Sequence, residues 1–282
     1  MITLNYKAYA KINLGLEILY KRQDRYHEIN TIFSRISLAD DINICKNSEL
    51  SVNCVSEDEI AQEDNLAYKA ALLLRRHYKV KEGAEIEVIK KIPTGAGLGG
   101  GSSDAATTLK GLSELWNIPV DLNILLKIAS DIGADVPYFL RQGMAVASGR
   151  GEKLEYFKLD LPYTVLLVMP GNKISSKWAY QNLAIGYLRK NPTDLRTALI
   201  NSVNKSELLK KSITNDFEGS IFKKYPELKV IKSKLYKSGA VLSLLSGSGS
   251  SIYGLYTSRG EAEKAMKIFT GYRIEVCDFI IL

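Results

Sequence analysis

Cysteine is scarce in this chain, and the few that occur follow no recognisable pattern. Cys45, Cys54 and Cys277 are the only three among 282 residues, and no two of them are spaced as CxxC. An odd number without that spacing indicates neither a disulfide framework nor a zinc site. We therefore expect these cysteines to be packing residues.

Long apolar runs are also missing. No run approaches the roughly eighteen residues that a membrane-spanning helix needs, and the first residues, MITLNYKAYAKINLGLEI, alternate polar with apolar side chains. A signal peptide would instead begin with a hydrophobic block. These absences predict a cytoplasmic protein that does not span a membrane.

The composition is that of a folded protein with an excess of positive charge. Hydrophobic residues make up 46% and charged residues 24% of the chain, and its length of 282 residues favours two domains. The formal net charge of +7 favours an anionic partner. That partner is a nucleic acid, a membrane surface or a phosphorylated small molecule, and charge alone does not choose among them.

Five glycines crowd into seven residues within the segment PTGAGLGGGSSDAAT, at 93–107. Before it, AEIEVIKKI predicts a strand with Ile86 and Val88 facing inward. After it, apolar residues recur at helical spacing, with Ser102 or Ser103 as the expected N-cap and Asp104 in the first turn. The predicted order is strand, glycine-rich loop, helix N-terminus.

This order suits a phosphate. The start of a helix leaves N–H groups unpaired, and glycines let the preceding backbone approach an anion closely. A Walker A loop would end in Gly-Lys-Ser/Thr, but no lysine lies between Lys91 and Lys110. A dinucleotide-binding strand would be continuously apolar, whereas the strand predicted here alternates. The Walker A loop is thus excluded, and the dinucleotide-binding loop, whose G-x-G-x-x-G pattern Gly95, Gly97 and Gly100 do spell, is disfavoured by the strand before it.

The segment PTGAGLGGGSSDAA resembles the second motif of the GHMP kinases, the superfamily of galactokinase, homoserine kinase and mevalonate kinase. It has the long form typical of the branch that acts on 4-diphosphocytidyl-2-C-methyl-D-erythritol. Six further segments resemble other motifs of this family and spread the likeness over nearly the whole chain: AKINLGLEI, RQDRYHEINTIF, EDNL, IGADVPYFL, NDFE and SGSGSSIYG.

The resemblance implies an α+β fold of two domains. Residues 1–157 are expected to form an ATP-binding N-terminal domain of the ribosomal-S5-domain-2-like type, and residues 158–282 a ferredoxin-like C-terminal domain on the substrate side. The residues agree with the second expectation, because helix, hairpin, helix and strand follow one another from Pro226 to the end.

The resemblance also assigns the catalytic pair. Asp135 is expected to act as the general base toward the substrate hydroxyl, and Lys11 to stabilise the ionised Asp135 and the charge developing nearby. From the residues alone, Asp135 equally suits the cap of a helical turn, and Lys11 a solvated strand face. ATP is the expected phosphoryl donor, accompanied by Mg²⁺, and no metal-ligating residue is predicted. The expected nucleotide-binding residues are Pro93, Gly95, Gly97, Leu98, Gly99, Gly100, Gly101, Ser102, Ser103 and Asn65.

On the substrate side, an aromatic ring beside an imidazole suits a nucleobase. The resemblance implies that Tyr26 stacks on a cytosine and that His27 contacts it. Tyr180 is the candidate for the second aromatic, with Trp178 as its competitor. Further expected contacts are Asn13, Ser176, Gly247 and Ser248.

Arg25 is a departure from the family pattern, because the family has glycine before the Tyr-His pair. If that position needs a positive φ, either Arg25 introduces strain into the turn or the turn is rebuilt, and the second outcome would change where Tyr26 and His27 lie.

The implied activity is ATP-dependent phosphorylation of the 2-hydroxyl of 4-diphosphocytidyl-2-C-methyl-D-erythritol, in the non-mevalonate route to isoprenoid precursors. The partner is thus a small molecule with a cytidine diphosphate group, and the protein a monomer or homodimer. The alternatives are another small-molecule kinase of the family, of the homoserine or mevalonate type, and an RNA-binding protein. The lysines disfavour RNA, since they lie along amphipathic helices and are not interleaved with aromatics.

Overall fold

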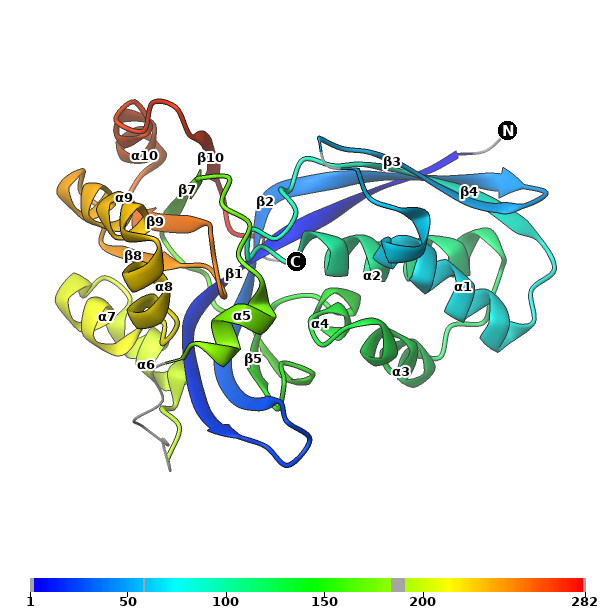
Figure 1. Ribbon diagram of the computed structural model, residues 1–282, viewed down its shortest axis with the longest axis horizontal. Coiled ribbons are helices and arrows are strands. Elements are labelled where there is room, and N and C mark those ends of the chain that lie inside the picture. The colour runs from blue at the N-terminus through cyan, green and yellow to red at the C-terminus, as the bar shows by residue number, and fades with distance from the viewer. Residues whose placement is uncertain (1–2, 58, 184–190, 281–282) are drawn as a thin grey trace. The chain divides into compact units, whose positions relative to one another are not determined.

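The computed structural model describes residues 3–57, 59–183 and 191–280 (Figure 1). The chain divides into two compact units, which are described separately. Unit 1 comprises Met1–Ala10, Leu38–Thr94 and Gly99–Gln142, and unit 2 comprises Lys11–Ser37, Gly95–Leu98 and Gly143–Leu282. The long strands β1 (Thr3–Lys21) and β2 (His27–Asn47) thus contribute residues to both units. The predicted domain boundary between residues 157 and 158 stays a prediction.

Unit 1 places helices against a sheet. Strand β4 (Gly83–Ile89) pairs antiparallel with the second half of β2 and parallel with β3 (Leu50–Val55). The alternation predicted for β4 is confirmed, because Ile86 and Val88 are buried while Glu85 is exposed. Figure 1 shows α1 and α2 along one face of these strands. The helices of unit 1 are η1 (Gln62–Asp64), α1 (Leu66–Tyr78), α2 (Gly100–Leu115), α3 (Leu122–Ile132) and α4 (Val136–Leu140).

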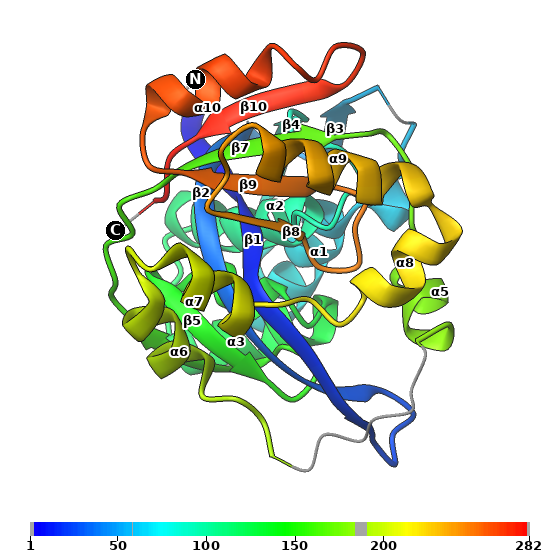
Figure 2. The same cartoon turned by 90° about the vertical axis from the view of Figure 1, so that its left-hand side faces the viewer.

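Unit 2 contains an antiparallel four-stranded sheet in the order β10-β7-β9-β8. Counted in chain order from β7 to β10, these four strands lie side by side in the order fourth, first, third, second. This is the strand order of a ferredoxin-like sheet, so the ferredoxin-like prediction is confirmed. Figure 2 shows α9 running over β9 and β8, with α10 beside β7 and β10. The strands are β7 (Thr164–Met169), β8 (Leu242–Leu245), β9 (Ile252–Tyr256) and β10 (Arg273–Cys277).

A hairpin and six helices complete the described part of unit 2. Strand β5 (Met144–Ser148) pairs with the first half of β2 and with β6 (Lys153–Phe157). The helices are α5 (Ser176–Gln181), α6 (Leu195–Ser202), α7 (Ser206–Ser212), α8 (Glu218–Lys224), α9 (Pro226–Lys237) and α10 (Arg259–Met266).

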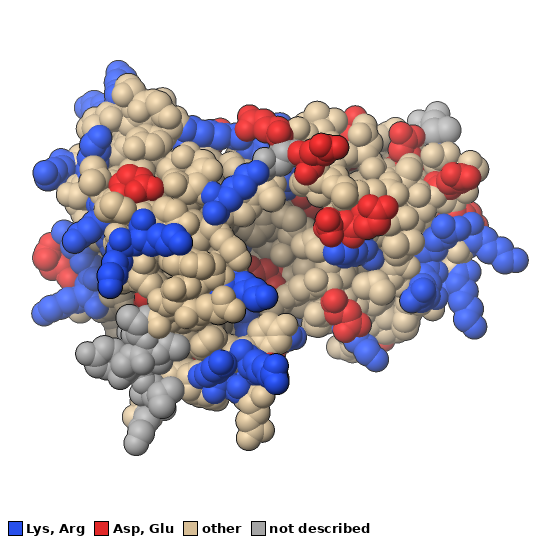
Figure 3. Space-filling view, in the orientation of Figure 1, with Lys and Arg blue, Asp and Glu red and all other residues tan. Residues whose placement is uncertain are grey.

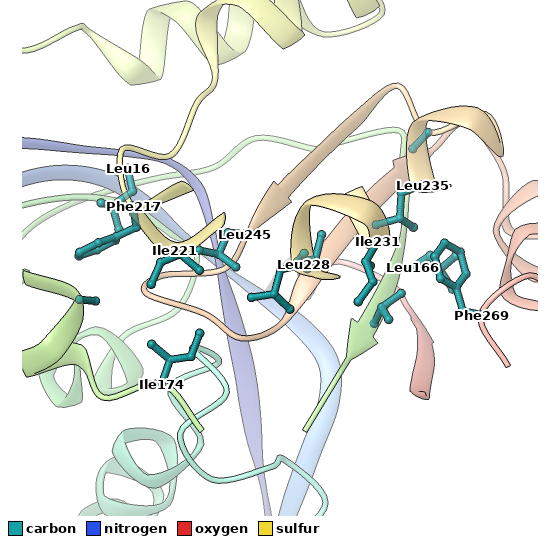
Figure 4. Close-up of a cluster of buried hydrophobic side chains, with 14 of the residues drawn as sticks. Leu16, Leu166, Ile174, Phe217, Ile221, Leu228, Ile231, Leu235, Leu245 and Phe269 are labelled. Carbon is teal, nitrogen blue, oxygen red and sulfur yellow. The ribbon is translucent and has the colours of Figure 1, made fainter. Parts of the chain in front are cut away.

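The core of unit 2 forms where α9 meets the sheet. Leu228, Ile231 and Leu235 form the apolar stripe that the sequence predicts, and all three are buried. Figure 4 shows Ile231 and Leu235 beside Leu166 of β7. Each such side chain contributes about 1.5–3 kcal/mol by leaving water. No helix within the described residues has the length and hydropathy that crossing a bilayer requires.

Candidate active site

The glycine segment, residues 95–101, leads into helix α2, and three of its glycines have left-handed backbone. Gly95, Gly97 and Gly99 have φ values of 69°, 77° and 69°. Helix α2 begins at Gly100 with Gly99 as its N-cap, so the predicted N-cap at Ser102 or Ser103 is wrong. Left-handed Gly99 turns the chain into the helix earlier than a side-chain cap would. Ser102 and Ser103 are therefore helical residues, and the Ser103 N–H donates to the Gly99 carbonyl at 2.9 Å.

Within unit 2, residues 95–98 of the glycine segment lie directly against residues 246–249, the Gly-Ser turn that follows β8. A Cβ atom at Gly97 would lie 2.1 Å from the carbonyl oxygen of Ser246. The Ser246 hydroxyl donates to the Gly97 carbonyl at 2.9 Å, and the Ser251 N–H donates to the Ala96 carbonyl at 3.2 Å. Two predicted motifs that are about 150 residues apart in sequence are thus in contact.

Lys11 lies at this junction, on β1. Its backbone N–H donates to the Leu98 carbonyl at 2.9 Å, and its side-chain Nζ donates to Asn13 Oδ1 at 2.8 Å. The residue is only 4% exposed, so the solvated-face interpretation of Lys11 is wrong. A Cβ atom at Gly247 would lie 3.4 Å from Asn13 Oδ1 and 3.6 Å from Lys11 Nζ. The structure therefore brings Lys11, Asn13, Gly97 and Gly247 together.

Two residues that the sequence did not single out hold Asn13. Its Nδ2 donates to Thr31 Oγ1 at 2.9 Å, and its backbone carbonyl accepts from the Tyr253 hydroxyl at 2.8 Å. The Thr31 hydroxyl in turn donates to the Gly15 carbonyl. Thr31 comes from β2 and Tyr253 from β9, so only the folded chain identifies them.

The NDFE segment has a physical role that the sequence did not reveal. The amide Nδ2 of Asn215 donates to the carbonyls of Leu245 and Gly247, both at 2.8 Å. Asp216 Oδ2 accepts from the Ile18 N–H of β1 at 2.8 Å. Asn215 and Asp216 thereby hold the Gly-Ser turn and β1 in the positions that Lys11 and Asn13 require.

Asp135 lies in unit 1, at the N-cap position of α4, and is half-buried. Its side chain makes no capping hydrogen bond to that helix, which weakens the cap interpretation. Lys11 belongs to unit 2, so the pairing of Asp135 with Lys11 stays a prediction. Unit 1 also holds Pro93 and Asn65, and Asn65 caps α1 by accepting from the Ala67 N–H at 2.9 Å.

The predicted base-binding aromatics lie in unit 2. The rings of His27 and Tyr180 stack with centroids 5.0 Å apart and planes 14° from parallel. Trp178 instead has the Lys224 ammonium over its ring, 4.4 Å from the centroid. Among the two candidates for the second aromatic, Tyr180 is the one beside His27. Ser176 and Ser248, also predicted, are joined by a hydroxyl–hydroxyl contact of 3.0 Å.

The surroundings of His27 suit a hydrogen bond from its neutral imidazole to a ligand. The surroundings of Tyr26 leave one face of its ring open. Burial, with the nearby charge of Lys21, lowers the pKa of His27, so its imidazole is neutral at pH 7 and offers one donor and one acceptor. Tyr26 is 56% exposed, and the Arg150 guanidinium lies 4.8 Å from its ring centroid. That contact covers one side of the Tyr26 ring.

Arg25 adopts a φ of 70°, the left-handed conformation that glycine takes most easily. Its N–H donates to the Arg22 carbonyl at 3.1 Å, and the Arg22 N–H donates to the Tyr26 carbonyl at 2.7 Å, closing the turn between β1 and β2. The expectation of local strain at this position is therefore confirmed. The turn is retained, and Tyr26 and His27 follow it directly.

Positive charge is spread over the face that Figure 3 shows. Figure 3 shows Lys and Arg side chains scattered over the visible face with Asp and Glu among them. Lys232 is paired with Glu218 at 2.5 Å, and Lys210 with Glu207 at 2.8 Å. A continuous basic stripe, which RNA binding would favour, is not seen on this face.

Two family models match the chain. The model of the GHMP kinases N terminal domain matches residues 65–143, and the model of the GHMP kinases C terminal domain matches residues 195–271.

Among curated proteins, 4-diphosphocytidyl-2-C-methyl-D-erythritol kinase of Chlorobium phaeobacteroides (strain BS1) is 42% identical, covering 94% of this chain and 93% of the relative. The protein of that name from Thermodesulfovibrio yellowstonii is 40% identical, covering 99% and 98%.

Solved structures agree with these matches. A crystal structure of 4-(cytidine 5'-diphospho)-2C-methyl-D-erythritol kinase has a TM-score of 0.81 and 32% identity, covering 97% of this chain and 99% of its own. Methanococcus jannaschii mevalonate kinase has a TM-score of 0.74 at 15% identity, covering 99% of both chains, and shows likeness of fold alone.

Because Gly97 lies against Ser246, we expect substitution by alanine to destabilise the protein much more at Gly97 than at Gly95. Gly97→Ala should lower the free energy of unfolding by about 3 kcal/mol or more, because the new methyl group meets a backbone carbonyl and the φ is positive. Gly95→Ala, with a similar φ and nothing within 4 Å of its Cβ, should cost only about 1 kcal/mol. Urea denaturation of both variants measures the difference, and equal losses would contradict the close approach.

The strained turn predicts that glycine is better than arginine at position 25. Arg25→Gly should raise the free energy of unfolding by up to about 1 kcal/mol, since relief of the left-handed strain outweighs the added freedom of the unfolded chain. Gln23→Gly, in the same turn but without positive φ, is the matched control and should lose about 0.5–1 kcal/mol. A loss of stability in Arg25→Gly would show that the arginine side chain holds the turn.

Proposed function

This chain belongs to the GHMP kinase family, and from that premise we propose that it transfers the γ-phosphoryl group of ATP to the 2-hydroxyl of 4-diphosphocytidyl-2-C-methyl-D-erythritol. The reaction belongs to the non-mevalonate route to isoprenoid precursors. Curated relatives named for this substrate, matching over at least 93% of this chain and of their own length, support the proposal.

The stacked rings of His27 and Tyr180 are the observation that favours an acceptor substrate containing a nucleobase. A flat pair of rings with a neutral imidazole suits a nucleobase, whereas homoserine and mevalonate contain no base for it to bind. In the proposed complex Tyr26 and Tyr180 stack on the cytosine, and His27 hydrogen-bonds its edge. Ser176, Ser248, Gly247 and Asn13 complete the acceptor contacts.

The glycine segment and the start of α2 fit the ATP phosphates. Gly95, Gly97 and Gly99 have left-handed backbone and no side chains, so a phosphate can approach the backbone of this segment closely. The sixteen-residue helix α2 begins at Gly100, where its unpaired N–H groups and the positive end of its dipole attract an anion. Asn65 and Pro93 are proposed to contact the nucleoside part. ATP supplies the phosphoryl group that is transferred.

The chemical step needs a base, a cation and an aligned acceptor. In the proposed step Asp135 accepts the proton of the tertiary 2-hydroxyl as its oxygen bonds to the γ-phosphorus, and the bond from that phosphorus to the bridging oxygen breaks to release ADP. Lys11, fixed by its hydrogen bond to Asn13, stabilises the ionised carboxylate and the developing negative charge.

Mg²⁺ is proposed to accompany ATP, bound chiefly by its phosphates as is usual for kinases. Among the described residues, no group of three or more His, Cys, Asp or Glu side chains is placed to hold a metal, so no protein ligand is assigned. A small-molecule partner follows from the proposed reaction. A cytoplasmic location and a monomeric or homodimeric state also stay proposals.

A substrate panel tests the proposed acceptor. With Mg-ATP, the protein should release ADP in the presence of 4-diphosphocytidyl-2-C-methyl-D-erythritol, and show at most background release with homoserine or mevalonate. Coupled detection of ADP measures turnover for each compound. Turnover with either of the other two, and none with the cytidine-linked alcohol, would overturn the proposal.

Replacing the proposed base tests the mechanism. Asp135→Asn should lower kcat by about 10²–10⁴-fold, because the amide cannot accept the proton, while ATP affinity measured by calorimetry stays close to that of the wild type. Asp131→Asn, the same change on an exposed residue of α3, is the matched control and should keep its activity. A wild-type rate in Asp135→Asn would remove Asp135 as the base.

A further inference from the structure

In unit 1, three buried charged side chains meet beside the first residues of α2. The Lys90 ammonium donates to Asp40 Oδ2 at 2.5 Å and to Asp104 Oδ2 at 2.7 Å. The side chains of Lys90, Asp40 and Asp104 are 8%, 0% and 5% exposed. Asp40 comes from β2, Lys90 follows β4, and Asp104 lies in the second turn of α2. The prediction that Asp104 lies in the first turn of the helix is wrong, because α2 begins at Gly100, earlier than the predicted cap at Ser102 or Ser103.

This cluster joins the two ends of the glycine segment. Asp40 Oδ1 accepts from the backbone N–H groups of Lys91 and Ile92, at 2.5 and 2.7 Å, and so fixes the chain just before the segment begins. At the other end, a Cβ atom at Gly100 would lie 2.9 Å from Ile92 Cγ2 and 3.2 Å from Lys90 Nζ. The ammonium is therefore packed against the first residue of α2.

We propose that Asp40, Lys90 and Asp104 act as a loop clamp, a set of positioning residues that holds both ends of the glycine segment at the spacing the ATP phosphates require. The inference rests on the proposed function only in taking ATP as the ligand. The three residues act through the backbone, so none of them needs to touch the nucleotide.

Stability alone accounts poorly for this cluster. Taking charges out of water costs several kcal/mol per ion, and replacing a buried ion cluster by apolar residues is often neutral or stabilising. Asp104 Oδ1 is buried and, within the described part of the chain, has no hydrogen-bond partner. A cluster with such a cost, placed where the chain enters and leaves the phosphate-binding segment, is better explained by positioning.

The clamp also carries a charge that responds to pH. Two carboxylates and one ammonium leave a net charge of −1 close to where the phosphates would bind. Burial raises the pKa of Asp104 to about 7, against the attraction of Lys90 and with the help of Asp40. Below pH 7 the proton neutralises the cluster, and above pH 7 the extra negative charge repels the nucleotide.

The charged groups that shift the pKa of Asp104 are Lys90 and Asp40. From β3, the Cys54 thiol interacts electrostatically with all three members of the clamp, and burial raises the pKa of Cys54. Where α1 meets the start of α2, uncharged Leu66 lies against Gly101. Helix α4, which also packs against α2, has no charged residue between Val136 and Leu140.

Two sets of substitutions test the clamp. Lys90→Met removes the hydrogen bonds of Lys90 to Asp40 and to Asp104. The triple variant Asp40→Asn, Lys90→Met, Asp104→Leu removes the same two hydrogen bonds and leaves no unpaired buried charge at these three positions. Both should weaken binding of the ATP analogue ATPγS, measured by calorimetry, by about tenfold or more, because the phosphate-binding backbone loses its fixed spacing. KM for ATP should rise in parallel, with kcat and KM for the acceptor changed less than about threefold.

Asp41→Asn, the same kind of change on the adjacent residue of β2, is the control. Asp41 pairs with Lys7 and Lys91 outside the clamp, and its loss should leave ATPγS affinity unchanged. If the triple variant folds with a melting temperature near that of the wild type and binds ATPγS normally, the clamp is overturned. Binding of ATPγS without turnover of the acceptor by the wild type would count against the proposed substrate only.

The pH profile gives a readout that a purely structural cluster would not move. For the wild type, the Kd for ATPγS should weaken between pH 6 and pH 8 by several-fold more than for Asp104→Asn, which keeps the cluster neutral throughout. Titration of the nucleotide itself is common to both proteins and cancels in the comparison. Parallel profiles would show that Asp104 does not influence the phosphates.

Discussion

The close approach of two backbone turns, residues 95–98 and 246–249, is the constraint on which the site in unit 2 depends. At Gly97 there is room for a hydrogen atom but not for a methyl group, since a Cβ would lie 2.1 Å from a carbonyl oxygen. The Ser246 hydroxyl and the Lys11 N–H bind the carbonyls of Gly97 and Leu98. Because β1 is hydrogen-bonded to the first turn and is linked to the second through Asn215 and Asp216, Lys11 and Asn13 have fixed positions before any ligand arrives.

Buried polar side chains maintain this approach. Asn215 donates to two carbonyls of the Gly-Ser turn, and Asp216 accepts from the backbone of β1. Unpaired carbonyls at these depths would each cost about 1–3 kcal/mol, so the amide of Asn215 both satisfies them and fixes the turn. Thr31 holds Asn13 from the neighbouring strand in the same way. The glycines allow the backbone to come close, and these side chains keep it there.

Local patterns in the sequence predicted much of this structure. Alternation identified β4, helical spacing identified α9, and the order of elements identified the ferredoxin-like sheet, because each depends on residues near one another in the chain. The same local reasoning failed at the start of α2, where a left-handed glycine replaces a side-chain cap. It could not foresee the burial of Lys11, or the partners Thr31 and Asn215, because those contacts join strands and turns far apart in sequence. The resemblance to a family pointed to the motif that contains Asn215 but not to what Asn215 holds.

Lys11 and Lys90, whose side chains are both largely buried, illustrate how the partners of a lysine decide what its charge can do. Lys90 donates to two carboxylates, whose combined negative charge outweighs its own when both are ionised, and it is therefore suited to holding the backbone in place. Lys11 donates to the amide of Asn13 and lies 5.0 Å from the centroid of the Phe33 ring, and neither of these groups carries a net charge. The Asn13 amide and the backbone hydrogen bond to Leu98 fix where the Lys11 ammonium lies. A cation held in this way suits the stabilisation of developing negative charge, which is the role proposed for Lys11, whereas Lys90 is suited to holding the phosphate-binding segment in shape.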